Sequence, residues 1–172
     1  MQKIKDIRVL TITAMLVAIA TVFGFFKVPI TQTLEIRFAF LPIAAGGMLF
    51  GPAVGMIIGI LSDLLGFFVK PTGPFFPGFT ISAAISGLLY GVCLYKKQLT
   101  VVRVIVTQLL QTLVISLGLN TLNLSILYGN GFLPLLSARL VQNLIMFPIN
   151  TVMLFIILRS LQQVSKQFLP QE

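Results

Sequence analysis

Long apolar runs separated by short polar connectors dominate this sequence. The first, residues 9–26, contains no charged side chain and is long enough for a helix to cross a bilayer core, which takes about 17 to 25 residues. Five more runs come after it, at residues 38–50, 53–69, 79–95, 100–119 and 136–158. Only 9% of the residues are charged, against about 25% in a soluble domain. The pattern predicts an all-α integral membrane protein with six transmembrane helices.

The length of the chain and the scarcity of reactive side chains limit its function. At 172 residues we expect one transmembrane domain, residues 1–172, in contact with the lipid bilayer. The chain has no histidine, one cysteine and four acidic residues, which excludes imidazole metal sites and His-containing catalytic groups. Asp63 is the one acidic residue expected at membrane depth. We therefore expect no enzyme, no metal site and no cofactor.

The basic residues are spread unevenly over the connectors. Six spans bring both termini to one side, and eight of the twelve basic residues then lie there: Lys3, Lys5, Arg8, Lys96, Lys97, Arg103, Arg159 and Lys166. The other four are Lys27, Arg37, Lys70 and Arg139. Because cytoplasmic loops carry the excess of lysine and arginine, we expect both termini of a multi-pass cell-membrane protein to be cytoplasmic. The net charge of +8 then reflects membrane topology, and we expect no nucleic-acid partner.

An irregular segment at 70–78 contains three prolines and two glycines. Because proline lacks an amide donor and clashes with the preceding turn, a regular helix is excluded there. The expected orientation puts this loop outside, together with connectors at 27–37, where an extended hairpin is plausible, and at 120–133. Thr80 has the side chain to cap the helix after the loop. The segment is either a plain connector or an aromatic loop over a ligand pocket.

Two of the runs carry small residues at helical spacing. These residues are Gly55, Gly59 and Gly66 in the third run, and Ala83, Gly87 and Gly91 in the fourth. Small residues at this spacing let helix backbones approach closely in lipid, so we interpret both faces as packing surfaces. Asp63 lies on the same face as the first set. A carboxylate at membrane depth must face a cavity or a partner.

The last two runs carry polar stripes. One consists of Gln108, Thr112, Ser116 and Asn120, with Asn123 beyond it, and the other of Arg139, Asn143, Phe147 and Asn150. The stripes either hydrogen-bond each other across the bundle or face a ligand. An arginine fork suits a carboxylate, and asparagine offers donors and acceptors to a heterocycle. The aromatic loop can supply a flat wall for a ring.

Two longer motifs resemble those of a known family. The first reads FAFLPIA at 38–44, followed by GMLFGP at 47–52, and the second reads PTGPFFPGFT at 71–80, followed by SAA at 82–84, Gly87 and a Tyr-Gly pair at 90–91. Over nearly its whole length, the chain resembles the membrane-embedded S components of energy-coupling factor (ECF) vitamin transporters, and more narrowly the folate-specific S component. The pair Ala14 and Ala18 matches the contact motif on the family's first helix.

The resemblance implies a high-affinity vitamin binder with an occluded site near the outer face. It also implies partners: folate, a transmembrane coupling subunit and two ATPase subunits, with Ala14 and Ala18 as the docking residues. The binder would deliver its vitamin inward when the ATPases hydrolyse ATP. The chain has no Gly-x-x-x-x-Gly-Lys-Ser/Thr phosphate-binding motif, so ATP hydrolysis falls to the partners.

The expected substrate-binding residues come partly from the loop motif and partly from position and chemistry. They are Asp63, Phe75, Phe76, Pro77, Gly78, Asn120, Asn123, Arg139 and Asn143. Arg139 is expected to hold a carboxylate of the folate tail, or alternatively to pair with Asp63 inside the bundle. Two other functions stay open: an S component for another vitamin such as riboflavin, and a membrane adaptor that transports nothing.

Overall fold

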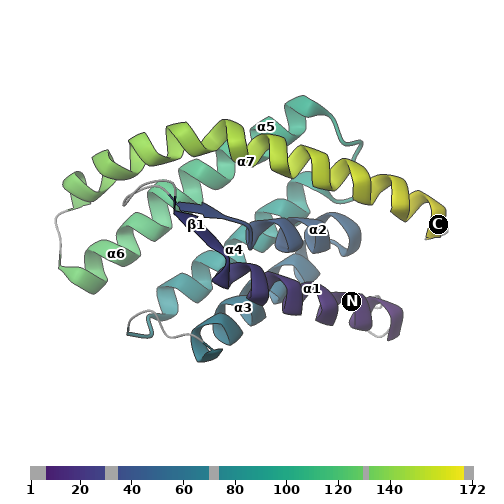
Figure 1. Cartoon of the computed structure of the whole chain (residues 1–172), viewed down its shortest axis with the longest axis horizontal. Coiled ribbons are helices and arrows are strands. Elements are labelled where there is room, and N and C mark those ends of the chain that lie inside the picture. Colours follow the sequence, from purple (N-terminus) through teal and green to yellow (C-terminus); the bar gives the residue numbers. More distant parts are fainter. Residues whose placement is uncertain (1–6, 30–34, 70–73, 130–131, 169–172) are drawn as a thin grey trace.

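The computed structural model describes residues 7–29, 35–69, 74–129 and 132–168, and they form a helical bundle with one small hairpin (Figure 1). The elements are α1 (Ile7–Phe25), β1 (Lys27–Pro29), β2 (Glu35–Arg37), α2 (Phe40–Phe50), α3 (Pro52–Val69), α4 (Pro77–Leu94), α5 (Val101–Leu110), the π-helix η2 (Gln111–Leu119), α6 (Asn120–Tyr128) and α7 (Phe132–Phe168). The all-helical membrane fold is confirmed, and the hairpin expected at 27–37 is present as an antiparallel pair in which Val28 lies opposite Ile36.

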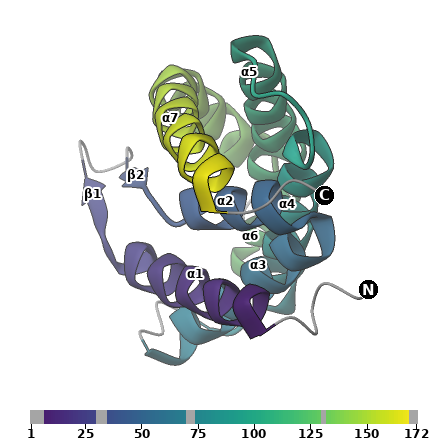
Figure 2. The same ribbon diagram turned by 90° about the vertical axis from the view of Figure 1, so that its right-hand side faces the viewer.

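Five helices in the described part of the chain are long and apolar enough to cross a membrane: α1, α3, α4, the continuous helix Val101–Tyr128, and α7. The sixth apolar segment, α2, is shorter but almost entirely buried from Leu41 to Gly47. It contacts α1, α3, α4 and α7, and Figure 2 shows it inside the bundle. A helix enclosed by other helices does not have to match the thickness of the bilayer, which accounts for its length.

The glycine faces of α3 and α4 pack against each other, as predicted. A Cβ at Gly87 would clash with the carbonyl of Gly55, and a Cβ at Gly59 would clash with the carbonyl of Ala83. These two helices also make the most extensive contact in the bundle. The small residues therefore let the two backbones touch directly, which is how helices associate in lipid without a hydrophobic driving force.

The prediction of a polar connector at 120–133 is wrong for most of these residues, because they are helical. Residues 101–128 form one continuous helix through α5, η2 and α6, which ends where Gly129 adopts a positive φ of 65°. The polar residues there form an inward-facing helix surface, because Asn123 is buried and donates a 2.9 Å hydrogen bond to Ser82 Oγ on α4. The polar composition of this segment suggested a loop, but its polar side chains are accommodated in a helix because they bond to neighbouring helices, as Asn123 does to Ser82.

The start of α4 also differs from the expectation. Helix α4 begins at Pro77 with Phe76 at the N-cap, and proline suits the first helical position because its missing amide has no partner there. Thr80 lies inside the first turn and does not cap the helix; its hydroxyl bonds to Asp63 on α3. The four loop residues Lys70 to Gly73 lie outside the described residues.

Candidate functional site

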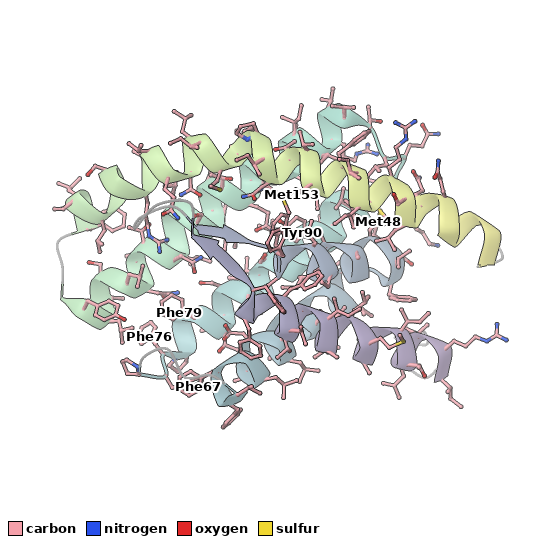
Figure 3. The ribbon with its side chains drawn as sticks, viewed as in Figure 1. Met48, Phe67, Phe76, Phe79, Tyr90 and Met153 are labelled. Atoms are coloured by element: carbon pink, nitrogen blue, oxygen red, sulfur yellow. The ribbon has the colours of Figure 1, made fainter. Side chains whose placement is uncertain are left out.

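A cavity of about 520 Å³ opens at one end of the bundle. Its lining comes from α1, α2, α3, the segment before α4, α4 itself, α6 and α7: Ala20, Thr21, Gly24, Phe25, Ala39, Ile43, Ser62, Asp63, Gly66, Phe67, Pro74, Phe75, Phe76, Phe79, Ala83, Asn120, Leu124, Leu127, Tyr128 and Arg139. Figure 3 shows the labelled Phe67, Phe76 and Phe79 at the end of the bundle away from both chain termini. This volume is in the range of pockets that enclose drug-sized ligands, roughly 300–1,000 Å³.

Aromatic rings form one wall of the cavity. Phe67 on α3 and Phe75 lie with ring centroids 5.1 Å apart and a tilt of 59°. Phe76 meets Phe79 edge to face at 6.0 Å. Both pairs have separations at which aromatic rings attract each other, so the rings support each other as a wall. Phe75 remains 48% exposed, which leaves its ring free to contact a ligand.

The acidic group of the cavity is Asp63 on α3. Its Oδ2 accepts a 2.7 Å hydrogen bond from Thr80 Oγ1 on α4, and the residue is only partly buried. Ser62, the preceding residue, is also in the lining, and its hydroxyl donates to the carbonyl of Gly59 on its own helix. A carboxylate oriented by one neighbour and open to a cavity can accept hydrogen bonds from a ligand.

The basic group of the cavity is Arg139 on α7. Its Nη1 donates a 3.1 Å hydrogen bond to the carbonyl of Ser116 on η2, and the side chain is partly buried. A guanidinium carries five N–H donors, so it can bond to several partners at once. Asn120, on the helix that carries Ser116, lines the same cavity.

The polar stripes of the last two spans meet at η2 and α7. Ser116 Oγ donates a 2.8 Å hydrogen bond to Asn143 Oδ1, and Asn143 Nδ2 donates at 2.8 Å to the carbonyl of Arg139. The interpretation that the two polar stripes hydrogen-bond each other across the bundle is therefore confirmed for Ser116 and Asn143. Its effect is to hold the backbone that carries Arg139 against η2.

The predicted site residues separate into two groups. Five of them line the cavity together: Asp63, Phe75, Phe76, Asn120 and Arg139. The other four, Pro77, Gly78, Asn123 and Asn143, are not among its lining residues. Gly78 packs tightly on the Asn123 amide, since a Cβ there would clash with Asn123 Oδ1.

Sequence reasoning missed the contribution of α1, from which Thr21, Gly24 and Phe25 line the cavity. A threonine and a glycine three residues apart, near the end of an otherwise apolar span, were the available signal. It also missed Tyr128, because the polar segment containing it was predicted to be a connector. No group of three or more His, Cys, Asp or Glu side chains in the described residues has a geometry that could hold a metal ion.

The fold and the site define a multi-pass membrane protein with a small-molecule cavity at one end of a helical bundle. The chain belongs to the family of ECF transporter substrate-specific components, whose model matches residues 8–158. The family consists of transporter components and not of enzymes.

Named relatives and solved structures agree with this membership. The chain is 38% identical to the folate transporter FolT of Clostridium novyi over 151 residues, 88% of each chain, and 33% identical to the FolT of Leuconostoc mesenteroides subsp. mesenteroides over 161 residues, 90% of this chain and 86% of that one. It superposes on a crystal structure of FolT bound with folic acid with a TM-score of 0.82, at 34% identity and coverage of 90% and 95% of the two chains. A structure of the S component of a bacterial ECF transporter gives a TM-score of 0.71 at 25% identity, covering 92% and 98%.

Proposed function

We propose that this chain is the folate-binding substrate-specific component of an ECF-type uptake transporter. The observation that carries the proposal is the cavity, in which Asp63, Asn120, Arg139 and an aromatic wall come together in a chain that resembles FolT over nearly its whole length. Of the nine predicted substrate-binding residues, the five that line the cavity, Asp63, Phe75, Phe76, Asn120 and Arg139, are the ones that would touch folate.

The chemistry of folate matches the lining. Folate joins a flat pterin, whose edge carries hydrogen-bond donors and acceptors, to a glutamate tail with two carboxylates. Phe75 and Phe76 would cover the ring, and Asp63 would accept hydrogen bonds from the pterin edge. Arg139 would donate to a carboxylate of the tail, an interaction for which its planar fork is suited. Riboflavin has no carboxylate that could accept hydrogen bonds from Arg139.

The basic residues support an orientation for the chain. Most of those in the described residues belong to the start of α1, the connector between α4 and α5, the start of α5 and the C-terminal part of α7: Arg8, Lys96, Lys97, Arg103 and Arg159. Figure 1 shows these segments at the end of the bundle that carries both termini, away from the cavity. The positive-inside rule then favours cytoplasmic termini and a cavity open to the exterior. In this orientation the single domain of residues 1–172 captures folate from outside.

Inward delivery requires partners, which we propose to be a transmembrane coupling subunit and two ATPases. Ala14 and Ala18 on α1 are both exposed in the isolated chain, so they offer a small-residue face to another helix. The proposal is tested by measuring binding and transport separately. Membranes containing this chain alone should bind tritiated folate and not riboflavin, and ATP-driven accumulation in liposomes should require the partner subunits. Accumulation by the chain alone would overturn the proposal that this chain binds folate while its partner subunits drive transport.

A further inference from the structure

An open surface groove of about 430 Å³ lies at the end of the bundle away from the proposed folate site. Its lining comes from the end of α4, the connector after it and the start of α5: Cys93, Lys97, Thr100, Val102, Arg103, Val106 and Thr107. We call it the α4–α5 groove. Figure 1 shows that the connector between α4 and α5 is at the same end as both chain termini.

The groove has a basic rim. Lys97 is exposed, and its ammonium group has no partner among the residues that the structure describes. Arg103 Nη1 donates a 2.7 Å hydrogen bond to the carbonyl of Gln98, which holds the guanidinium at the rim. The hydroxyl of Thr100 makes no capping bond to α5. No carboxylate is among the described residues of the lining, so nothing in the groove neutralises its two positive charges.

Apart from Thr107, the rest of the groove is apolar, and its exposed side belongs to a helix long and apolar enough to cross a membrane. Val102, 66% exposed, lies next to Arg103 at the rim, and Val106, 48% exposed, lies one turn deeper on α5; Cys93 on α4 and the buried Thr107 complete this part of the lining. Exposed valines on a transmembrane helix contact acyl chains. The groove therefore continues from positively charged groups at the membrane edge to an apolar surface within the membrane.

We propose that the α4–α5 groove binds an anionic phospholipid. Lys97, Arg103 and Thr100 donate hydrogen bonds to its phosphate, and an acyl chain lies along Val102 and Val106. Basic pockets between transmembrane helices on the cytoplasmic side are suited to such headgroups, and each basic residue near an anionic surface contributes about 1 kcal/mol. Free phosphate shares the headgroup chemistry, but it would leave the apolar part of the groove unused. The inference uses none of the residues of the proposed folate site.

Native mass spectrometry of the detergent-solubilised chain tests the proposal, with phosphatidylglycerol and phosphatidylcholine as probes. The wild-type chain should retain phosphatidylglycerol in preference to phosphatidylcholine. Lys97→Gln should weaken phosphatidylglycerol binding about fivefold, the equivalent of one lost charge contact. The matched control is Lys96→Gln, because Lys96 is its neighbour but lies 5.8 Å over the Tyr95 ring and does not line the groove. Unchanged thermal unfolding verifies that both variants are folded.

Two further comparisons identify the source of the phosphate group. Val106→Trp fills the apolar part of the groove and should weaken phospholipid binding, whereas Ile105→Trp, at an adjacent lipid-facing position outside the groove, should not. Inorganic phosphate at millimolar concentration should not displace the lipid. Displacement by phosphate would identify a free-anion site, and equal losses for Lys96→Gln and Lys97→Gln would identify diffuse attraction. Either result, or equal retention of both lipids by the wild-type chain, overturns the proposal.

Discussion

Thr80 Oγ1 on α4 donates a 2.7 Å hydrogen bond to Asp63 Oδ2 on α3, so two adjacent helices jointly orient the acidic group of the cavity. Asp63→Asn should therefore lower folate affinity about tenfold or more, since a hydrogen bond to a charged group contributes about 1.5–3 kcal/mol. Thr80→Val removes only the orienting bond and should cause a smaller loss. Isothermal titration calorimetry with folate measures both.

The control for the Asp63 and Thr80 variants is Thr112→Val. The Thr112 hydroxyl bonds within its own helix, to the carbonyl of Gln108, and Thr112 does not line the cavity. Its folate affinity should match that of the wild type. Wild-type affinity in Asp63→Asn would show that the carboxylate does not contact the ligand.

Arg139 is predicted to recognise the glutamate tail of folate. Arg139→Ala should weaken folate binding about tenfold or more and leave a pterin that lacks the tail nearly unaffected, because only folate loses a charge-assisted contact. Titrating both ligands separates two roles. Equal losses would mean that Arg139 shapes the cavity through its 3.1 Å bond to the Ser116 carbonyl. Arg159→Ala is the control, since this arginine stacks on Phe155 at the other end of α7.

The exposed face of α1 is predicted to be the docking surface for the coupling subunit. Ala14→Trp and Ala18→Trp should each abolish ATP-driven folate accumulation in the assembled complex, because a bulky ring prevents close helix approach. Folate binding by the isolated chain should persist, since neither residue lines the cavity. Met15→Trp changes a neighbouring exposed position and should transport normally. Normal transport by both alanine variants would mean that docking uses another face.

The contact between α3 and α4 predicts opposite effects for two glycine substitutions. Gly87→Ala should destabilise the chain by about 1–3 kcal/mol, because its Cβ would overpack against the Gly55 carbonyl. A Cβ added at Gly66 would have no neighbouring atom within 4 Å. Gly66→Ala should therefore be neutral or stabilising, since alanine is favoured over glycine in a helix. Thermal unfolding in detergent checks both. Similar melting temperatures for the two variants would contradict the close approach of the two helices.

The fold could be predicted from the sequence wherever apolar length decided the structure. The spans, the tight glycine faces and the hairpin arise from patterns that act locally. The boundaries near Asn120 and Thr80 could not be predicted in the same way. In both places a polar side chain finds its partner on a different helix, as Thr80 does at Asp63, and such pairings depend on the packed bundle.

The same distinction applies to the candidate site. Asp63 and Arg139 stand out in the sequence because a charged side chain within a membrane is energetically costly and usually faces a partner or a cavity. Thr21 and Tyr128 do not stand out, because each is an ordinary residue that only the packing of the whole bundle brings to the lining of one cavity. Conversely, the amide of Asn143 has the chemistry for a ligand contact, yet both of its ends are engaged, by the Ser116 hydroxyl and by the Arg139 carbonyl.

The nine-residue π-helix between α5 and α6 makes the residue count of this helix a determinant of the cavity wall. A π-helix closes its backbone hydrogen bonds between residues i and i+5, so it holds more residues per turn than the α-helix, in which each residue turns by about 100°. Rewinding Gln111–Leu119 as an α-helix of the same number of residues would therefore turn Asn120 and Leu124 away from the cavity, while Val104 and Thr107 kept their buried positions. A chimera that takes α6 from a relative must preserve the length of this segment, even where every substituted side chain is compatible.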